Sequence, residues 1–186
     1  MENAARDPYF VALFETAKAV HSSLDLDEVL NELVRNSAEA LGVKAASLRL
    51  LDPNGETLAL RAHHGLSSDY LGKGPVLLEE SDIDRQALRG EPVVVRDVRR
   101  DFRFQYPEEA AEEGICSVLC VPLTLRDQGI GVLRVYSSDE QSFDHGEKEL
   151  LTAMATLGAI AIRNAETFAR VRSDLASLED YVTSAR

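Results

Sequence analysis

Apolar residues recur at helical spacing in two segments near the N-terminus. Residues 9–20 carry one apolar stripe, and residues 26–41 carry a second and longer one. The second stripe consists of Leu26, Val29, Leu30, Leu33, Val34, Ala38 and Leu41. Asp25, followed three residues later by Glu28, has the pattern of a capping box, and Gly42 is a typical helix stop. The pattern therefore predicts two consecutive helices before the first strand.

Shorter apolar runs predict five strands in the middle of the chain. Residues 44–52 and 56–64 are predicted to form a hairpin, because the Asp-Pro-Asn-Gly sequence at their junction favours a tight turn. Further strands are predicted at residues 92–97, 114–123 and 130–136. In the last strand the alternation places Val132, Arg134 and Tyr136 on one face, and Leu133 and Val135 on the other.

The segments between these strands are more irregular. Residues 65–80 contain three glycines and a proline and are predicted as a loop. Ser81, with Asp84 three residues later, is expected to start a short helix that ends at Gly90, and a second short helix is expected from Pro107 to Glu113.

The longest predicted element is a helix over residues 146–184, a segment that contains no proline. At about 1.5 Å per residue it extends ~58 Å, which is more than a single domain can cover, so its end must project. Phe168, Val171, Leu175, Leu178 and Val182 form a stripe on its second half, with heptad steps from Val171 onward and a register shift near Phe168. The stripe favours a coiled-coil homodimer over a solvated single helix. Its heptad register still holds near Arg186, which suggests a helix that continues in a longer protein.

The order of elements predicts an α+β fold. We expect a central antiparallel sheet with the N- and C-terminal helices on one face, and with short helices and loops covering the other. The expected domain covers residues 8–165, and residues 166–186 form a C-terminal helical extension.

Four stretches of the chain resemble the GAF domain, a sensory module of bacterial signalling proteins and phosphodiesterases. In order they are SLDLDEVLNELVRNSAEALGVKAASLRLLD, ESDIDRQALRGEPVVVRDVRRD, EEGICSVLCVPL and GIGVLRVYSSDEQSFDHGEKELLTAMATLGAIAIRNA. The segment VPLTLRDQGIGVLRVYS, leading into FDHGEKELL, is the most specific. The resemblance covers about residues 10–165 and implies the same sheet and helix arrangement that the periodicity predicts.

The resemblance also implies a ligand pocket between the sheet and the irregular segment at about residues 96–113. The candidate lining residues are Arg96, Arg99, Phe102, Phe104, Tyr106 and Cys116. Arginine forks suit a carboxylate or phosphate, which would make the ligand an anion. Asp97 and Asp101 offer the alternative that the arginines are paired locally, and the three aromatic residues alternatively pin the loop to the core. The sequence does not identify a cofactor.

Composition and charge disfavour two classes of partner, nucleic acids and membranes. The chain has 186 residues and a formal net charge of −12, which disfavours nucleic acid because phosphate binding needs a cationic surface. No apolar run approaches the ~20 residues that span a bilayer, and the N-terminus lacks a signal-peptide pattern. We therefore expect a cytoplasmic location and no membrane partner.

Two cysteines raise the alternative of thiol chemistry. On a strand, Cys116 and Cys120 share a face but lie ~13 Å apart, too far to bridge each other or to share a metal ion. Val118 lies between them on the same face, which favours core. A rival hypothesis is a redox sensor, or an enzyme similar to the free methionine sulfoxide reductases of the family, that uses Cys116 or Cys120.

Other ligands and chemistries find little support. The Asn-Lys pair and the later acidic pair of cyclic-nucleotide-binding relatives are absent, and neither cysteine adjoins the histidine that bilin attachment needs. His21, His63, His64 and His145 form no zinc-enzyme motif, although a single histidine leaves haem ligation open. No nucleophile elbow is present, so we expect a protein that is not an enzyme.

The sequence thus predicts a non-catalytic sensory module that binds an unidentified small molecule and forms a homodimer through its terminal helices. The resemblance implies that the C-terminal helix transmits the ligand state to an output domain, such as a histidine kinase or nucleotide cyclase, in cis or in trans. No output domain is recognisable within these 186 residues. A ligand-free dimerisation adaptor is the third hypothesis.

Overall fold

A six-stranded antiparallel sheet, with helices on both faces, organises the chain. The computed structural model describes the backbone of residues 7–23 and 25–184, and side chains as far as residue 177. The helices are α1 (Pro8–Ser22), α2 (Leu26–Leu41), α3 (Ser68–Leu71), α4 (Asp82–Leu88), α5 (Pro107–Glu112) and α6 (His145–Ser184). The strands are β1 (Ala45–Leu51), β2 (Thr57–His64), β3 (Val76–Leu77), β4 (Val93–Val95), β5 (Ser117–Leu125) and β6 (Gln128–Ser137). The strand order is β3-β2-β1-β6-β5-β4.

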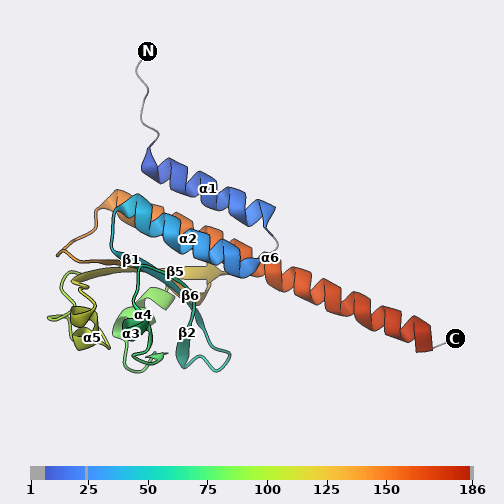
Figure 1. Ribbon diagram of the computed structural model, residues 1–186. Coiled ribbons are helices and arrows are strands. Elements are labelled where there is room, and N and C mark those ends of the chain that lie inside the picture. The colour runs from blue at the N-terminus through green and yellow to red at the C-terminus, as the bar shows by residue number, and fades with distance from the viewer. Residues whose placement is uncertain (1–6, 24, 185–186) are drawn as a thin grey trace, which may run out of the picture.

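The long helices α1, α2 and α6 lie on one side of the sheet, and the short helices α3, α4 and α5 lie on the other (Figure 1). This confirms the predicted α+β arrangement. The central strands β1, β6 and β5 are buried on both faces, so their side chains alternate between two separate clusters.

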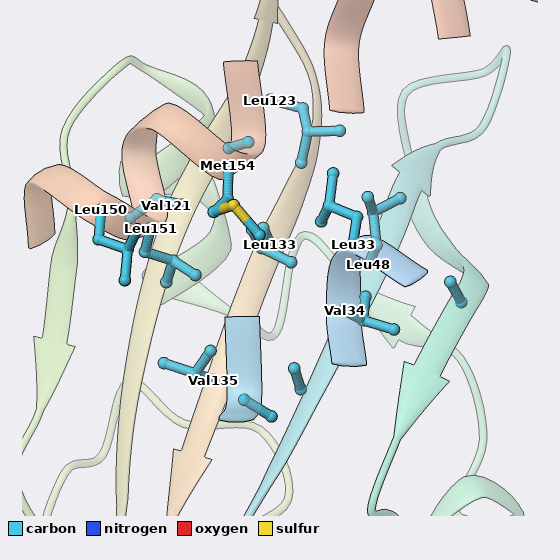
Figure 2. Close-up of a cluster of buried hydrophobic side chains, with 14 of the residues drawn as sticks. Leu33, Val34, Leu48, Val121, Leu123, Leu133, Val135, Leu150, Leu151 and Met154 are labelled. Atoms are coloured by element: carbon cyan, nitrogen blue, oxygen red, sulfur yellow. The ribbon is translucent and has the colours of Figure 1, made fainter. Parts of the chain in front are cut away.

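The cluster beneath the long helices is aliphatic (Figure 2). Leu133 and Val135 of β6 contribute to it, together with Leu33 of α2 and with Leu151 and Met154 of α6. Val132, Arg134 and Tyr136 of β6 are buried in the opposite direction, as the alternation predicts. One strand thus joins the α6 side of the sheet to the short-helix side.

Local sequence explains where the helices start. Asp144 and Glu147 form a complete capping box at α6: the Glu147 amide donates to Asp144 Oδ1 at 2.9 Å, and the Asp144 amide donates to Glu147 Oε2 at 2.6 Å. Asp25 accepts from the amides of Asp27 and Glu28 at 3.0 and 3.2 Å and so caps α2.

Two elements of the fold differ from the sequence prediction. The segment 65–80, predicted as a loop, contains helix α3 and strand β3. They have four and two residues, too few to display a period. In addition, Ser81 makes no capping hydrogen bond to α4, because Asp84 is directed into the interior instead.

Helix α6 extends well past the sheet (Figure 1). Its first half packs on β5, α2 and α1. Every residue from 166 to 177 is exposed to solvent. Phe168, Val171 and Leu175 are among these exposed residues. The side chains of Leu178 and Val182, the other two residues of the predicted stripe, lie outside the described part.

Candidate functional site

A charged pair lies buried on the short-helix side of the sheet. Arg134 of β6 donates from Nε to Asp84 Oδ1 of α4 at 3.1 Å, and its Nη2 donates to Asp84 Oδ2. The residues are 4% and 0% exposed. Ser81 Oγ adds a hydrogen bond of 2.6 Å to Asp84 Oδ2. This bidentate geometry is the one in which an arginine and a carboxylate can remain charged away from water.

Protonation of the neighbouring groups follows from this pair. Burial alone favours loss of the Arg134 proton, but Asp84 opposes it and holds the pKa of Arg134 well above its ordinary value. Burial, and then the Asp84 carboxylate, raise the pKa of the Cys120 thiol well above its usual range. Cys120 Sγ accordingly donates to Asp84 Oδ1 at 3.6 Å. Cys120 is therefore a neutral thiol, which is a poor nucleophile.

A second arginine, Arg49 of β1, is buried beside the pair without a carboxylate of its own. Arg49 faces Val132 and Ser47 faces Arg134 in the β1–β6 register, so the two arginines are diagonal neighbours on one sheet face. Arg49 is 3% exposed, and its Nη1 donates to the Leu58 carbonyl at 3.3 Å. Its Nε has no hydrogen-bond partner among the described residues. An unpaired buried guanidinium N–H is a costly arrangement.

Aromatic residues cover these charges. Tyr70 of α3 meets Tyr136 edge to face, with ring centroids 6.2 Å apart, and Tyr136 shares a 2.8 Å hydrogen bond with Ser47. The Tyr70 hydroxyl is buried and lacks a partner among the described residues. Burial, and then Tyr136, raise the pKa of Tyr70 well above its ordinary value, so the phenol is neutral. Phe104 stacks on Arg134, with the guanidinium carbon 5.9 Å from the ring centroid.

Lys73 lies with these aromatic residues over the buried charges. Its Nζ lies 3.9 Å from the ring centroid of Tyr70 and 5.4 Å from that of Tyr106. Burial, followed by the charges of Arg49 and Arg134, lowers the pKa of Lys73 to about 8. We call Arg49, Ser81, Asp84 and Arg134 the buried polar centre, and residues 65–80 and 96–113 its two cover segments.

The predicted site residues fall into two separate places. Phe104 and Tyr106 lie at the cover of the buried polar centre. Arg96 and Phe102 instead line an open surface groove of about 580 Å³ with Arg100, Arg103 and Lys148, and Phe102 is 93% exposed. Cys116 is half-buried, and its thiol lies 3.9 Å from the Arg96 carbonyl oxygen.

The arginine cluster is paired locally. Arg99 binds Asp97 through two hydrogen bonds of 2.8 Å, and Arg103 binds Asp101 through bonds of 2.9 and 2.6 Å. The arginine contacts lower the pKa of both aspartates. These pairs agree with the alternative that the interleaved aspartates satisfy the cluster without a ligand.

Sequence reasoning missed Arg49, Tyr70, Lys73 and Asp84 as members of a site. For Arg134 the sequence did carry a sign of a buried charge, because the alternation of the last strand places this residue on the same face as Val132 and Tyr136. The partner Asp84 lies 50 residues away and carries no comparable indication.

The described residues hold no group of three or more His, Cys, Asp or Glu side chains with the spacing of a metal site. Within the same part of the chain, no helix has the length and apolar character needed to cross a membrane.

The antiparallel sheet, with the long helices on one face and the short helices on the other, defines an α+β domain of the GAF type. The sequence pattern of the GAF domain family matches residues 23–163. The chain belongs to the GAF domain family.

Relatives occur in larger regulatory proteins. A Nif-specific regulatory protein of Herbaspirillum seropedicae is 30% identical over 171 residues, which cover 89% of this chain and 31% of that protein. The chain thus spans less than a third of this relative. The GAF domain of an Acinetobacter phosphoenolpyruvate-protein phosphotransferase is 27% identical with a TM-score of 0.73, and the match covers 90% of this chain and 97% of that domain.

The fold is also shared with an enzyme. Free methionine-R-sulfoxide reductase from Neisseria meningitidis, solved in complex with its substrate, is 22% identical with a TM-score of 0.70, over 86% of this chain and 90% of that one. At this identity the likeness establishes a common fold and no common chemistry.

Proposed function

We propose that the chain is the non-catalytic regulatory module of a signal-transduction protein, and that it binds a small molecule at the buried polar centre. The observation that carries the proposal is the unpaired Arg49 beside the Arg134–Asp84 pair, enclosed by two cover segments. Charged groups buried with unused hydrogen-bonding capacity are typical of ligand sites rather than of cores. The Nif-specific relative supports the regulatory assignment.

Strand β6 provides the connection from the ligand to the output. Arg134 lies on the ligand side, whereas Leu133 and Val135 on the same strand lie in the aliphatic cluster with Leu151 and Met154 of α6. A displacement of β6 would therefore be felt by α6. A ligand with different affinities for two positions of α6 would shift their populations and so regulate an output domain, in cis or in trans.

The terminal helices are the proposed dimer interface. Phe10 and Phe14 of α1 are exposed and stack on each other, with ring centroids 6.3 Å apart. Phe168, Val171 and Leu175 continue an exposed apolar surface along α6. Leu178 and Val182 extend the heptad pattern in sequence, and a second copy of the chain would remove this apolar surface from water.

Thiol chemistry is the competing function, and the surroundings of Cys120 argue against its use of that cysteine. Cys120 is fully buried and protonated beside Asp84. The cysteines can be tested directly by replacing both with serine. We expect the ligand response of α6 to persist in Cys116→Ser/Cys120→Ser, whereas its loss together with a loss of methionine sulfoxide reduction would establish the enzyme.

Native mass spectrometry of the freshly purified full chain tests the sensory proposal. We expect a dimer that carries a bound small molecule, and a change in the distance between spin labels on α6 of the two protomers when that molecule is dialysed away. A dimer with no bound molecule, and with an α6 distance that no added metabolite changes, would favour the ligand-free adaptor.

A further inference from the structure

The charges on the short-helix side of the sheet do not balance. Arg49 and Arg134 bring two guanidinium groups into the interior, and Asp84 neutralises one of them. No carboxylate of the described residues forms an ion pair with Arg49. One positive charge therefore remains unmatched in a setting from which water is largely removed.

The donors around this charge point to a carboxylate. Arg49 Nε and the Tyr70 hydroxyl are both buried without partners, and both donate hydrogen bonds. Tyr70 is neutral because burial, and then Tyr136, raise its pKa, so its proton is available to an acceptor. Lys73 lies on the Tyr70 ring and adds a second cation. Donors without a matching acceptor favour an anionic guest over a cationic or neutral one.

Apolar residues surround the donors and restrict the guest further. Leu58, Val76, Ile83 and Phe104 belong to the cluster that encloses them. A guest that places a carboxylate on Arg49 would have a carbon skeleton against these side chains. Arg49 and Lys73, whose pKa of about 8 leaves it protonated near neutral pH, together match the two charges of a dicarboxylate. Inorganic phosphate carries a similar charge but has no carbon skeleton to place against these apolar side chains.

Hydrogen bonds join the two cover segments at two places. The Ser67 amide and hydroxyl donate to the Glu113 carboxylate, and a second set of bonds forms a seam between residues 75–80 and 105–106. Tyr106 Oη donates to the Pro75 carbonyl at 2.7 Å, and the Leu77 amide donates to Gln105 Oε1 at 3.1 Å. Gln105 Nε2 donates to Glu80 at 2.8 Å. A guest would enter by opening this seam, which would separate residues 75–80 from residues 105–106 without breaking the pairing of the central strands.

We propose that the module binds a small organic carboxylate, with Arg49 as the residue that pairs with the carboxylate group and Tyr70 as a second donor. This inference rests on the proposed ligand-binding function and specifies its ligand class. Arg134 remains paired with Asp84 and holds α4 against β6. The specificity for an acid over its amide therefore depends on Arg49.

Titration calorimetry with the full chain tests this assignment. The probes are succinate and glutarate at millimolar concentration, with succinamide as the uncharged match and inorganic phosphate as the alternative anion. We expect at least one of the two acids to bind, and succinamide to bind at least tenfold more weakly. Binding of phosphate but neither acid, or of succinamide as tightly as succinate, would overturn the carboxylate assignment, as would no binding by either acid.

Two arginine variants separate recognition from folding. Arg49→Met should weaken binding of the acid about tenfold or more, because charge-assisted hydrogen bonds are lost. Its melting temperature without ligand should not fall, since the variant removes an uncompensated charge. The matched control Arg61→Met changes an exposed side chain of β2, and that variant should bind like the unaltered chain. Equal affinity of Arg49→Met and Arg61→Met would overturn the role of Arg49.

Native mass spectrometry and the α6 response distinguish failure of the carboxylate assignment from failure of the sensory function. A neutral or cationic molecule found by native mass spectrometry, together with an α6 response, would refute the carboxylate and leave the sensory function intact. Absence of any bound molecule and of any α6 response would instead remove the sensory function itself.

Discussion

At the scale of single residues, the buried charges are the unusual part of this domain. Most of its interior is aliphatic, and one charged pair between β6 and α4 replaces apolar contacts there. A buried ion pair contributes little net stability over an apolar pair of similar volume, but loss of one partner leaves the other charge uncompensated. Arg134 and Asp84 should therefore be tolerant of joint replacement and intolerant of single replacement.

Removing one member of the pair should destabilise the domain strongly. We expect Arg134→Met to lower the free energy of unfolding by about 3–5 kcal/mol, because Asp84 then stays buried without its partner. The double variant Asp84→Leu/Arg134→Met should lose less than the sum of the single variants. Urea unfolding measures all three. The control is Arg61→Met, which breaks the exposed pair with Asp27 and should lower the free energy of unfolding by less than about 1 kcal/mol. If Arg134→Met lowered it no more than Arg61→Met does, the buried pair would not have the predicted role.

Lys73 should make stability depend on alkaline pH. Its pKa of about 8 lies below the ordinary value of 10.5, mainly through burial and then through Arg49 and Arg134, against the opposing charges of Glu109 and Glu113. Above pH 8 the folded chain has lost the Lys73 proton that the unfolded chain still holds, so Lys73 contributes a rise in stability with pH from about 8 upward. Cys120 contributes a fall in the same range, because its raised pKa keeps a proton on the folded chain that the unfolded thiol loses. The Lys73 contribution is therefore the difference between the pH profiles of the Lys73 variant and the unaltered chain.

Unfolding in urea from about pH 7 to about pH 9.5, below the ordinary pKa of tyrosine, measures this slope. Lys73→Met should make the slope of stability against pH more negative than in the unaltered chain, whereas Lys18→Met on the exposed face of α1 should leave the slope unchanged. An identical pH profile in the Lys73 and Lys18 variants would show that Lys73 is not the group responsible.

At the scale of elements, the sheet depends on close approach of its central strands. Gly131 of β6 is paired with Leu50 of β1 and with Leu123 of β5. A Cβ atom at Gly131 would overlap the carbonyl oxygen of Arg49, which is backbone and cannot rotate away. The lack of a side chain at this position therefore allows β1 to lie against β6 near Arg49.

Gly131→Ala should consequently disturb the strand that carries Arg49. We expect a loss of about 1–3 kcal/mol in the free energy of unfolding, as for other overpacked interiors. Gly72→Ala is the matched control, because its Cβ would meet its nearest neighbours at 3.4 Å. That change should stay within about 0.5 kcal/mol. A Gly131→Ala variant as stable as Gly72→Ala would argue against the close strand approach.

Elements with a clear period were predictable from sequence, and the polar centre was not. Helix α2 and strand β6 repeat their apolar residues at 3.6 and 2 residues, so local pattern was sufficient to identify them. The pairing of Arg134 with Asp84 spans 50 residues and depends on how α4 packs on the sheet. Moreover, Ser81 and Asp84 imitate a capping box, a local role that the buried ion pair displaces.

At the scale of the whole molecule, α1 and the projecting part of α6 both present exposed apolar side chains. Phe14 and Phe168 are examples of this apolar surface, and both are more than half exposed. A single domain gains nothing from such a surface, whereas a symmetric pair of chains buries it on both copies. The proposed dimer explains why an otherwise polar helix keeps an apolar stripe after it leaves the sheet.

Acidic substitutions on this surface should separate the protomers. We expect Phe168→Glu/Val171→Glu to weaken dimerisation about a hundredfold or more, because two apolar side chains per protomer lose their buried contacts. Sedimentation velocity over a range of concentrations measures the effect. Ser173→Glu, on the opposite side of the heptad, should leave the dimer intact. A monomer before any substitution would refute the interface.

Because α6 projects past the sheet, a small tilt at its base produces a larger displacement at its far end. Residues 166–184 extend roughly 28 Å past the sheet at about 1.5 Å per residue. A tilt of about 5° at the base therefore displaces the far end sideways by about 2.5 Å. In the proposed dimer, a small repacking around Met154 would thus change the spacing between the far ends of two neighbouring helices.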